Sequence, residues 1–153
     1  MASSIDRLID LNADVGEGPG EEPLYALVTS ANIACGGHAG TDASMRDALR
    51  LALRHGVAVG AHPSYPDTEH FGRVTMSLAP QAVTQAVAAQ VAALLRIAAT
   101  EGARVTHVKP HGALYNDAHK DRALAEIVID SIRAVDPALP IVCSDSSQMA
   151  AAA

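Results

Sequence analysis

The sequence is poor in aromatic residues: it has no Trp, one Phe and three Tyr among 153 residues. The hydrophobic share is nevertheless 49%, and much of it consists of Ala and Val. The core must therefore be built from small aliphatic side chains that pack closely in helices and strands. This composition favours an α/β fold over a β-sandwich, and the length suits a single domain.

Cysteine is also scarce. Cys35 and Cys143 are far apart and form no C-x-x-C pair, which speaks against a disulfide framework and against a zinc knuckle. A nucleophilic Cys35 would need a neighbouring base, and His38 lies three residues further along the chain. A buried or site-lining thiol is the simpler interpretation.

Positive charge is low and scattered. Eleven Lys and Arg residues stand against 17 Asp and Glu, which gives a net charge of -6. We expect no nucleic-acid or anionic-membrane surface from this balance. Residues 1–10 show no basic start followed by an apolar stretch of signal-peptide length, and no window approaches 18 apolar residues without charge. The sequence therefore predicts a cytoplasmic protein.

Strand-like runs alternate with helical runs along the chain, which is typical of βα units around a parallel sheet. A long loop over residues 62–77 follows the third strand, and loops of this length tend to be functional. The predicted strands are 7–12, 30–35, 57–61, 103–109 and 141–143, and the predicted helices are a brief one at 21–29, one from the Thr41 cap to Gly56, one from Pro80 to Gly102 and one that carries Leu124 and ends before Asp136.

Polar residues gather where each predicted strand gives way to the next loop. In parallel α/β folds this is the face at which ligands bind. The residues concerned are Asn12 and Asp14 for the first strand, Asn32, Cys35 and His38 for the second, His62 for the third, and His107, Lys109 and His111 for the fourth.

Several of these features also have plain structural interpretations. The glycines of residues 16–20 match neither G-x-G-x-x-G nor G-x-x-x-x-G-K-[ST], so we do not expect them to bind a nucleotide. His38, His62 and His111 could be turn residues that hydrogen-bond to the backbone. We place His55 and His119 on the surface, and His70 in the long loop could have either role.

Lys109 indicates the chemistry of the site more clearly than the histidines do. In a strand His107 and Lys109 share a face, so a barrel with that face inside would hold an imidazole and an ammonium at its mouth. Such a Lys can hold an anionic group or polarise a carbonyl, and Asp14 can act as general base or keep the Lys charged. The alternative is an edge strand with Lys109 in water.

A second chemical interpretation is a metal centre. His38, His62 and His111 together with Asp14 form a ligand set that suits a divalent transition metal with an open position for water. This pattern would indicate a metal-dependent deacetylase or amidohydrolase.

Four long motifs stand out in the sequence: residues 10–18, 30–40, 60–67 with Phe71-Gly72-Arg73, and 107–116. Together they resemble the LamB/YcsF family, whose members include the A subunit of the bacterial ATP-dependent 5-oxoprolinase. The resemblance covers nearly all of the chain. It implies an α/β barrel of the glycoside hydrolase/deacetylase type and hydrolytic opening of the 5-oxoproline lactam to glutamate, with partner subunits B and C using ATP to activate the lactam.

For such a reaction our hypothesis takes Asp14 as the general base and Lys109 and His111 as groups that polarise the carbonyl or hold the substrate carboxylate. The pocket would be shaped by Asn12, Asn32, Arg73 and Tyr115. A third possibility is a non-catalytic subunit that captures a small acid or amide and docks on partner chains.

The length departs from the family pattern. A closed barrel of this kind takes roughly 250 residues, whereas the predicted strands stop at residue 143 and the chain ends in four alanines. We therefore expect residues 1–153 to form one domain, the N-terminal part of a barrel truncated after about five strands. With its last strand at an open edge, this polypeptide should not be a stable monomer alone, but should pair with a second chain or carry a further segment.

Overall fold

Four parallel strands form the centre of the fold. The structure is a computed structural model and describes residues 9–153. The strands pair in chain order, β1-β2-β3-β4, so each strand lies beside the one that follows it, as in a barrel-like α/β fold. Their bounds are Asn12–Val15 for β1, Ser30–Ala34 for β2, Ala58–His62 for β3 and Val105–Val108 for β4.

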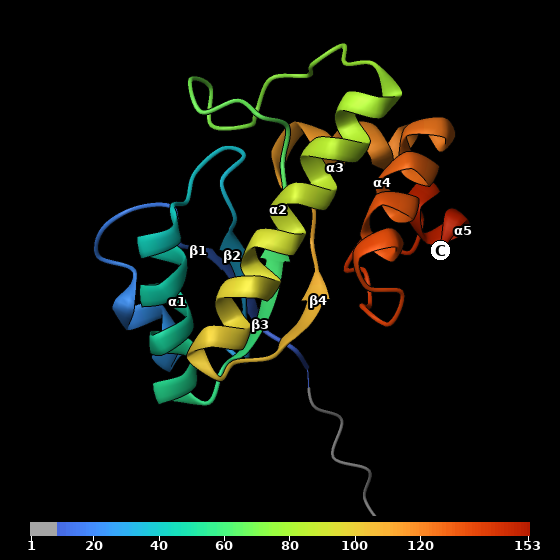
Figure 1. Cartoon of the computed structure of the whole chain (residues 1–153). Coiled ribbons are helices and arrows are strands. Elements are labelled where there is room, and N and C mark those ends of the chain that lie inside the picture. The colour runs from blue at the N-terminus through green and yellow to red at the C-terminus, as the bar shows by residue number, and fades with distance from the viewer. Residues whose placement is uncertain (1–8) are drawn as a thin grey trace, which may run out of the picture.

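Helices cover one face of this sheet. Figure 1 shows α1 (Asp42–His55) and α2 (Pro80–Glu101) side by side in front of the strands, and both contact β3. Helix α4 (Arg122–Val135) packs on α2. The short 3₁₀ helix η1 (Glu22–Ala26) contacts α1. The α/β fold with a parallel sheet is thus confirmed.

The ends of the two long helices follow from the sequence. Thr41 and Ser44 form a reciprocal capping box at the start of α1. Pro80 occupies the first turn of α2, where its missing N–H has no helical partner to lose. Both helices stop at a glycine, Gly56 and Gly102, as predicted.

The core is built from small aliphatic side chains, as the composition indicates. One face of α2 forms an inner stripe of this core, because Val83, Val87, Val91, Leu94 and Ala98 are all buried. By length and composition alone α2 could cross a membrane. Its burial against α1, α4 and the sheet explains the same apolar composition, since a core helix passes that test equally well.

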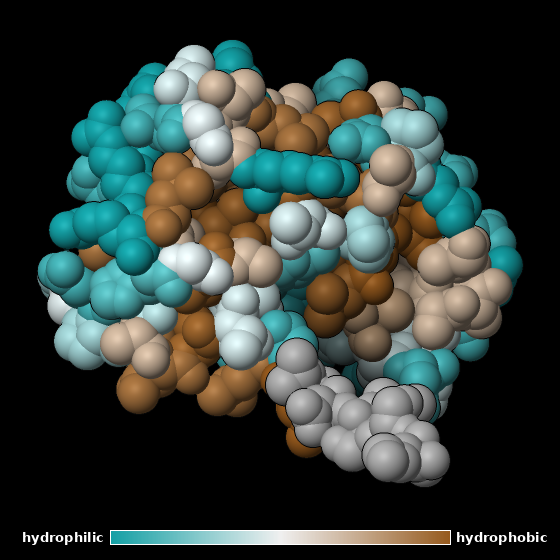
Figure 2. Space-filling model, turned by 90° about the horizontal axis from the view of Figure 1, so that it is seen from below, coloured by the Kyte–Doolittle hydropathy of each residue, from teal (hydrophilic) through white to brown (hydrophobic). Residues whose placement is uncertain are grey.

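Large hydrophobic side chains are also found on the surface. Ile9, Leu11 and Leu27 are more than half exposed. Figure 2 shows brown hydrophobic groups among teal hydrophilic ones on the face seen from below.

The first strand differs from the prediction. Residues 7 and 8 lie outside the described part of the chain, and β1 begins at Asn12 rather than ending there. The apolar residues that suggested an earlier strand, Ile9 and Leu11, are 86% and 57% exposed. Pairing with β2 decides the position, because Asn12 lies opposite Ser30 and Val15 opposite Ile33. Asn12 and Asp14 are therefore strand residues.

The C-terminal part differs in two ways. Residues 141–143 form no strand; Ile141 makes a single bridge to Val108. The tail after them is not without structure, because α5 (Gln148–Ala152) starts at a Ser147 cap and buries Met149 against α4 and α3. Its contacts lie with helices, so it does not extend the sheet.

The segment after β4 holds two helices where one was predicted. Helix α3 (Gly112–Lys120) ends at Asp121, whose side chain accepts hydrogen bonds from the N–H groups of Ala123 and Leu124 and so caps α4. The break comes from this cap, which fixes Asp121 in an extended conformation.

Truncation of Leu94 tests the importance of the core stripe. Leu94→Ala should lower the free energy of unfolding by about 2–5 kcal/mol, because a buried Leu is lost and a cavity remains. Leu27→Ala is the control, since Leu27 is 70% exposed and its loss should change stability by less than about 0.5 kcal/mol. Urea unfolding followed by circular dichroism measures both; equal effects would contradict this packing.

Candidate functional site

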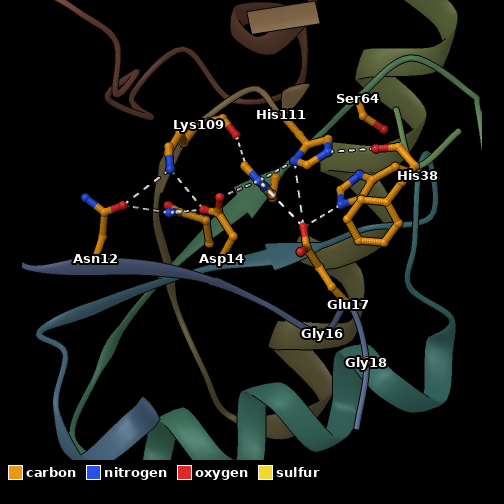
Figure 3. Close-up of polar contacts among 12 residues, drawn as sticks. Asn12, Asp14, Gly16, Glu17, Gly18, His38, Ser64, Lys109 and His111 are labelled. Carbon is orange, nitrogen blue, oxygen red and sulfur yellow. Dashed lines mark hydrogen bonds and ion pairs between the residues drawn. The ribbon is translucent and has the colours of Figure 1, made fainter. Parts of the chain in front are cut away.

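The polar residues named above meet at the carboxyl ends of the strands. Asp14 projects from β1, His62 is the last residue of β3, and Lys109 and His111 follow β4 directly. His38 comes from the turn after β2. Figure 3 shows the side chains of Asp14, His38, Lys109 and His111 converging, with Glu17 from the turn after β1 beside them. The predicted convergence on one edge of the sheet is thus observed.

Lys109 and Asp14 belong to a connected network. The Lys109 ammonium donates to Asp14 Oδ1 at 2.9 Å and to Asn12 Oδ1 at 3.4 Å. The Asn32 amide donates to the same two oxygens, at 2.9 Å to Asp14 and 3.0 Å to Asn12. The oxygen of Asn32 in turn lies 2.9 Å from His107 Nε2. Lys109 and His107 therefore serve one network, as expected for residues on one face.

The register of the sheet makes this network possible. Asp14, Asn32, Gly60 and His107 are paired in one row across the four strands. A Cβ at position 60 would overlap the His107 ring. Only glycine at this position lets the ring lie across β3 and reach Asn32.

The network keeps Asp14 ionised. Partial burial by itself would raise the pKa of this carboxyl group, but its interaction with His62 and the hydrogen bonds from Lys109 and Asn32 outweigh burial and hold the pKa well below its usual range. A carboxylate with so low a pKa is a weak proton acceptor.

A second group of side chains lies beside the first. Glu17, His38, His62 and His111 each offer one ligand atom, and these atoms all lie within 4.8 Å of one another. His38 Nε2 is 2.7 Å from Glu17 Oε1, and His111 Nδ1 is 3.0 Å from His62 Nε2. The three imidazoles are buried and Glu17 is half-buried. This His–Glu cluster is the kind of ligand set that can hold a divalent metal.

The long loop closes over the cluster. The Phe71 carbonyl oxygen lies 2.9 Å from His111 Nε2. Phe71 has a φ of 56°, a backbone conformation that residues other than glycine rarely adopt. Gly72 follows with a φ of 64° and lies against His38 and His111. The loop thus holds the two rings, which stack with centroids 3.7 Å apart.

The backbone N–H groups of the glycine-rich turn after β1 bind a carboxylate of the chain itself. The backbone N–H groups of Gly16, Glu17 and Gly18 donate to the Glu21 carboxylate at 2.6, 3.0 and 3.0 Å. These donors point at a side chain of the same turn, which agrees with the expectation that this turn is no phosphate-binding loop. The turn instead positions Glu17.

A small cavity opens beside the network. Its volume is about 160 Å³, below the roughly 300–1,000 Å³ of pockets for drug-sized ligands, so it suits a small molecule. The residues that line it include Asp14, His62, Lys109, Gly112, Tyr115 and Asn116.

Other residues singled out from the sequence have different surroundings. Tyr115 lines the cavity and its hydroxyl accepts a hydrogen bond from Ser144 N at 2.8 Å. Arg73 is exposed, with its guanidinium 5.2 Å from the centre of the Phe71 ring. His70 bonds to Asp67 at 3.0 Å, outside the His–Glu cluster.

Glu17 is the member of the cluster that the sequence analysis does not single out. It stands inside one of the four motifs, but the sequence points to Asp14 as the carboxylate partner of the histidines. Asp14 Oδ2 does lie 3.4 Å from His62 Nε2, yet its other oxygen is committed to Lys109 and Asn32. A second carboxylate in the glycine-rich turn after the same strand is the signal that could have found it.

Comparisons with known proteins agree with this geometry. The LamB/YcsF family matches residues 9–153. A solved structure, the lactam utilization protein from Thermus thermophilus, is 43% identical with a TM-score of 0.91. The match covers 94% of this chain and 61% of that chain, so the present chain spans about three-fifths of the length of this relative.

The space around Gly60 can be tested. Gly60→Ala should displace His107, break its contact with Asn32 and lower the free energy of unfolding by about 1–3 kcal/mol, as overpacking does. Gly18→Ala is the matched control, because a Cβ at position 18 meets nothing within 4 Å. Thermal unfolding and the imidazole signals in NMR measure the effect; an unmoved His107 signal in Gly60→Ala would refute the close approach.

The two thiols should differ in reactivity. Burial raises the pKa of the Cys35 thiol to about 12, so Cys35 should not react with a disulfide reagent at pH 7 in the folded protein. The partly exposed Cys143 should react, giving one thiol per chain before unfolding and two after it. Reaction of the folded Cys143→Ser variant at the wild-type rate would contradict this assignment.

Proposed function

The chain belongs to the LamB/YcsF family, and on this basis we propose that it acts in lactam utilization as the A subunit of an ATP-dependent 5-oxoprolinase. In this proposal it opens the lactam of 5-oxoproline by hydrolysis to give glutamate. The family match, the 43% identical lactam utilization protein and the cavity beside Lys109 support the proposal.

The observation that carries the proposal is the ammonium of Lys109 at the wall of a small polar cavity. Lys109 can hold the carboxylate of the substrate or polarise its lactam carbonyl. Asp14 keeps Lys109 in place through the 2.9 Å ion pair. This ion pair favours a role for Asp14 in keeping Lys109 charged over a role as general base. Asn12 and Asn32 hold Asp14 and Lys109 by hydrogen bonds and act as positioning residues.

His111 also takes a positioning role in this proposal. It lies behind His62, with its Nδ1 3.0 Å from His62 Nε2, and His62 is the imidazole that lines the cavity. Tyr115 forms part of the cavity wall. Arg73 lies outside this wall in the described structure, so its predicted contact with substrate remains a proposal for the assembled complex.

The proposal assigns ATP to partner subunits B and C. A planar amide resists hydrolysis, so its carbonyl must be activated and a water must be positioned. In the described residues the glycine-rich turn directs its N–H groups at Glu21. We therefore place phosphate binding on the partners, and the complex in the cytoplasm where ATP is supplied.

Variants of the cavity test the proposal. With 5-oxoproline, ATP and subunits B and C, Asp14→Asn and Lys109→Ala should each lower glutamate formation about 10²–10³-fold, the typical effect of removing one preorganised electrostatic group. Lys120→Ala is the control, because Lys120 is exposed. If both cavity variants kept the full rate, the role assignment would be wrong.

A binding experiment separates catalysis from capture. Calorimetric titration of 5-oxoproline should show binding that weakens in Lys109→Ala but not in Lys120→Ala. Binding without turnover in the presence of B, C and ATP would favour the non-catalytic subunit. Turnover without B and C would favour a self-sufficient deacetylase or amidohydrolase.

A further inference from the structure

The rings of His62 and His111 face each other in an unusual way. His62 Nδ1 lies 2.6 Å from the carbonyl oxygen of Lys109, and His111 Nε2 lies 2.9 Å from that of Phe71. A carbonyl oxygen only accepts hydrogen bonds, so each of these nitrogens carries its ring's hydrogen. In the neutral rings the opposite nitrogens, His62 Nε2 and His111 Nδ1, therefore present lone pairs to each other at 3.0 Å.

Two lone pairs at this distance repel unless a cation lies between them. A metal ion would meet both lone pairs at once, together with the Glu17 and His38 ligand atoms that lie within 4.8 Å of them. The backbone carbonyls meanwhile hold both rings in the orientation that metal-ligating histidines usually have, with the second N–H bonded away from the ion.

Two further ligand atoms complete the set. Glu17 Oε1 lies 3.9 Å from His62 Nε2 and 3.7 Å from His111 Nδ1, and 2.7 Å from His38 Nε2. Around a tetrahedral ion with bonds of about 2.0–2.2 Å, neighbouring ligand atoms are about 3.3–3.6 Å apart. The observed separations lie on both sides of this range, so small movements of the side chains would close the site.

We propose that Glu17, His38, His62 and His111 bind one divalent transition metal ion of the Zn²⁺ class. Three imidazole nitrogens and a single carboxylate favour such an ion over Mg²⁺ or Ca²⁺, which prefer oxygen ligands. The geometry makes Glu17 the fourth ligand, in place of Asp14. An ion at this position supplies a Lewis acid next to the cavity that Asp14 and Lys109 line.

The test measures metal binding alone, so its outcome is separate from that of the proposed lactam reaction. The chain, prepared without a histidine tag, is freed of metal by a chelator and titrated with Zn²⁺ and with Mg²⁺ in separate calorimetric experiments. We expect one Zn²⁺ per chain and no saturable Mg²⁺ binding. Co²⁺ should give the strong visible absorption of a four- or five-coordinate ion.

Variants locate the ion. Glu17→Gln keeps the shape of the side chain and should weaken Zn²⁺ binding at least tenfold, and His38→Ala should weaken it further. His70→Ala is the matched control, because His70 is exposed and bonds to Asp67 outside the set. If His38→Ala fails to fold, Glu17→Gln decides. No stoichiometric Zn²⁺ in the wild-type chain, or wild-type affinity in Glu17→Gln, would overturn the proposal.

Discussion

The candidate site depends on one constraint, the parallel register of four neighbouring strands. This register sets Asp14, Asn32, Gly60 and His107 in a single row. Residues that are up to 93 positions apart in the chain thereby become neighbours. Side chains alternate between the two faces of a strand. If one strand slipped by one residue along its neighbour, its residue in this row would point to the opposite face of the sheet.

The row joins two groups of different chemistry. On one side Lys109 and Asp14 form an ion pair at a cavity, and on the other side three imidazoles gather around Glu17. His62 belongs to both, because it lines the cavity and also faces His111. His62 therefore couples the ion pair to the His–Glu cluster, since any movement of His62 changes the surroundings of Asp14 as well.

The loop over residues 62–77 supplies what the strands cannot. Strand ends can direct imidazoles to one place, but the hydrogen bond that orients His111 is accepted by the Phe71 carbonyl oxygen in the loop. The loop adopts a left-handed backbone at both Phe71 and Gly72, and the carbonyls of these two residues accept hydrogen bonds from the His111 ring and from Ala113 N. Strain of this kind is typical of sites where the backbone serves a function.

Much of this protein is determined by the sequence alone. The small aliphatic core, the helices that begin at Thr41 and Pro80, and the meeting of polar residues at one edge follow from composition, capping signals and the rule for parallel strands. Such features depend on neighbours in the chain or on a general property of the fold. Only the tertiary structure decided the rest. The position of β1 depends on its pairing with β2. Glu17 rather than Asp14 completes the His–Glu cluster, because the distances between side chains from separate strands are fixed only when the strands are paired and packed.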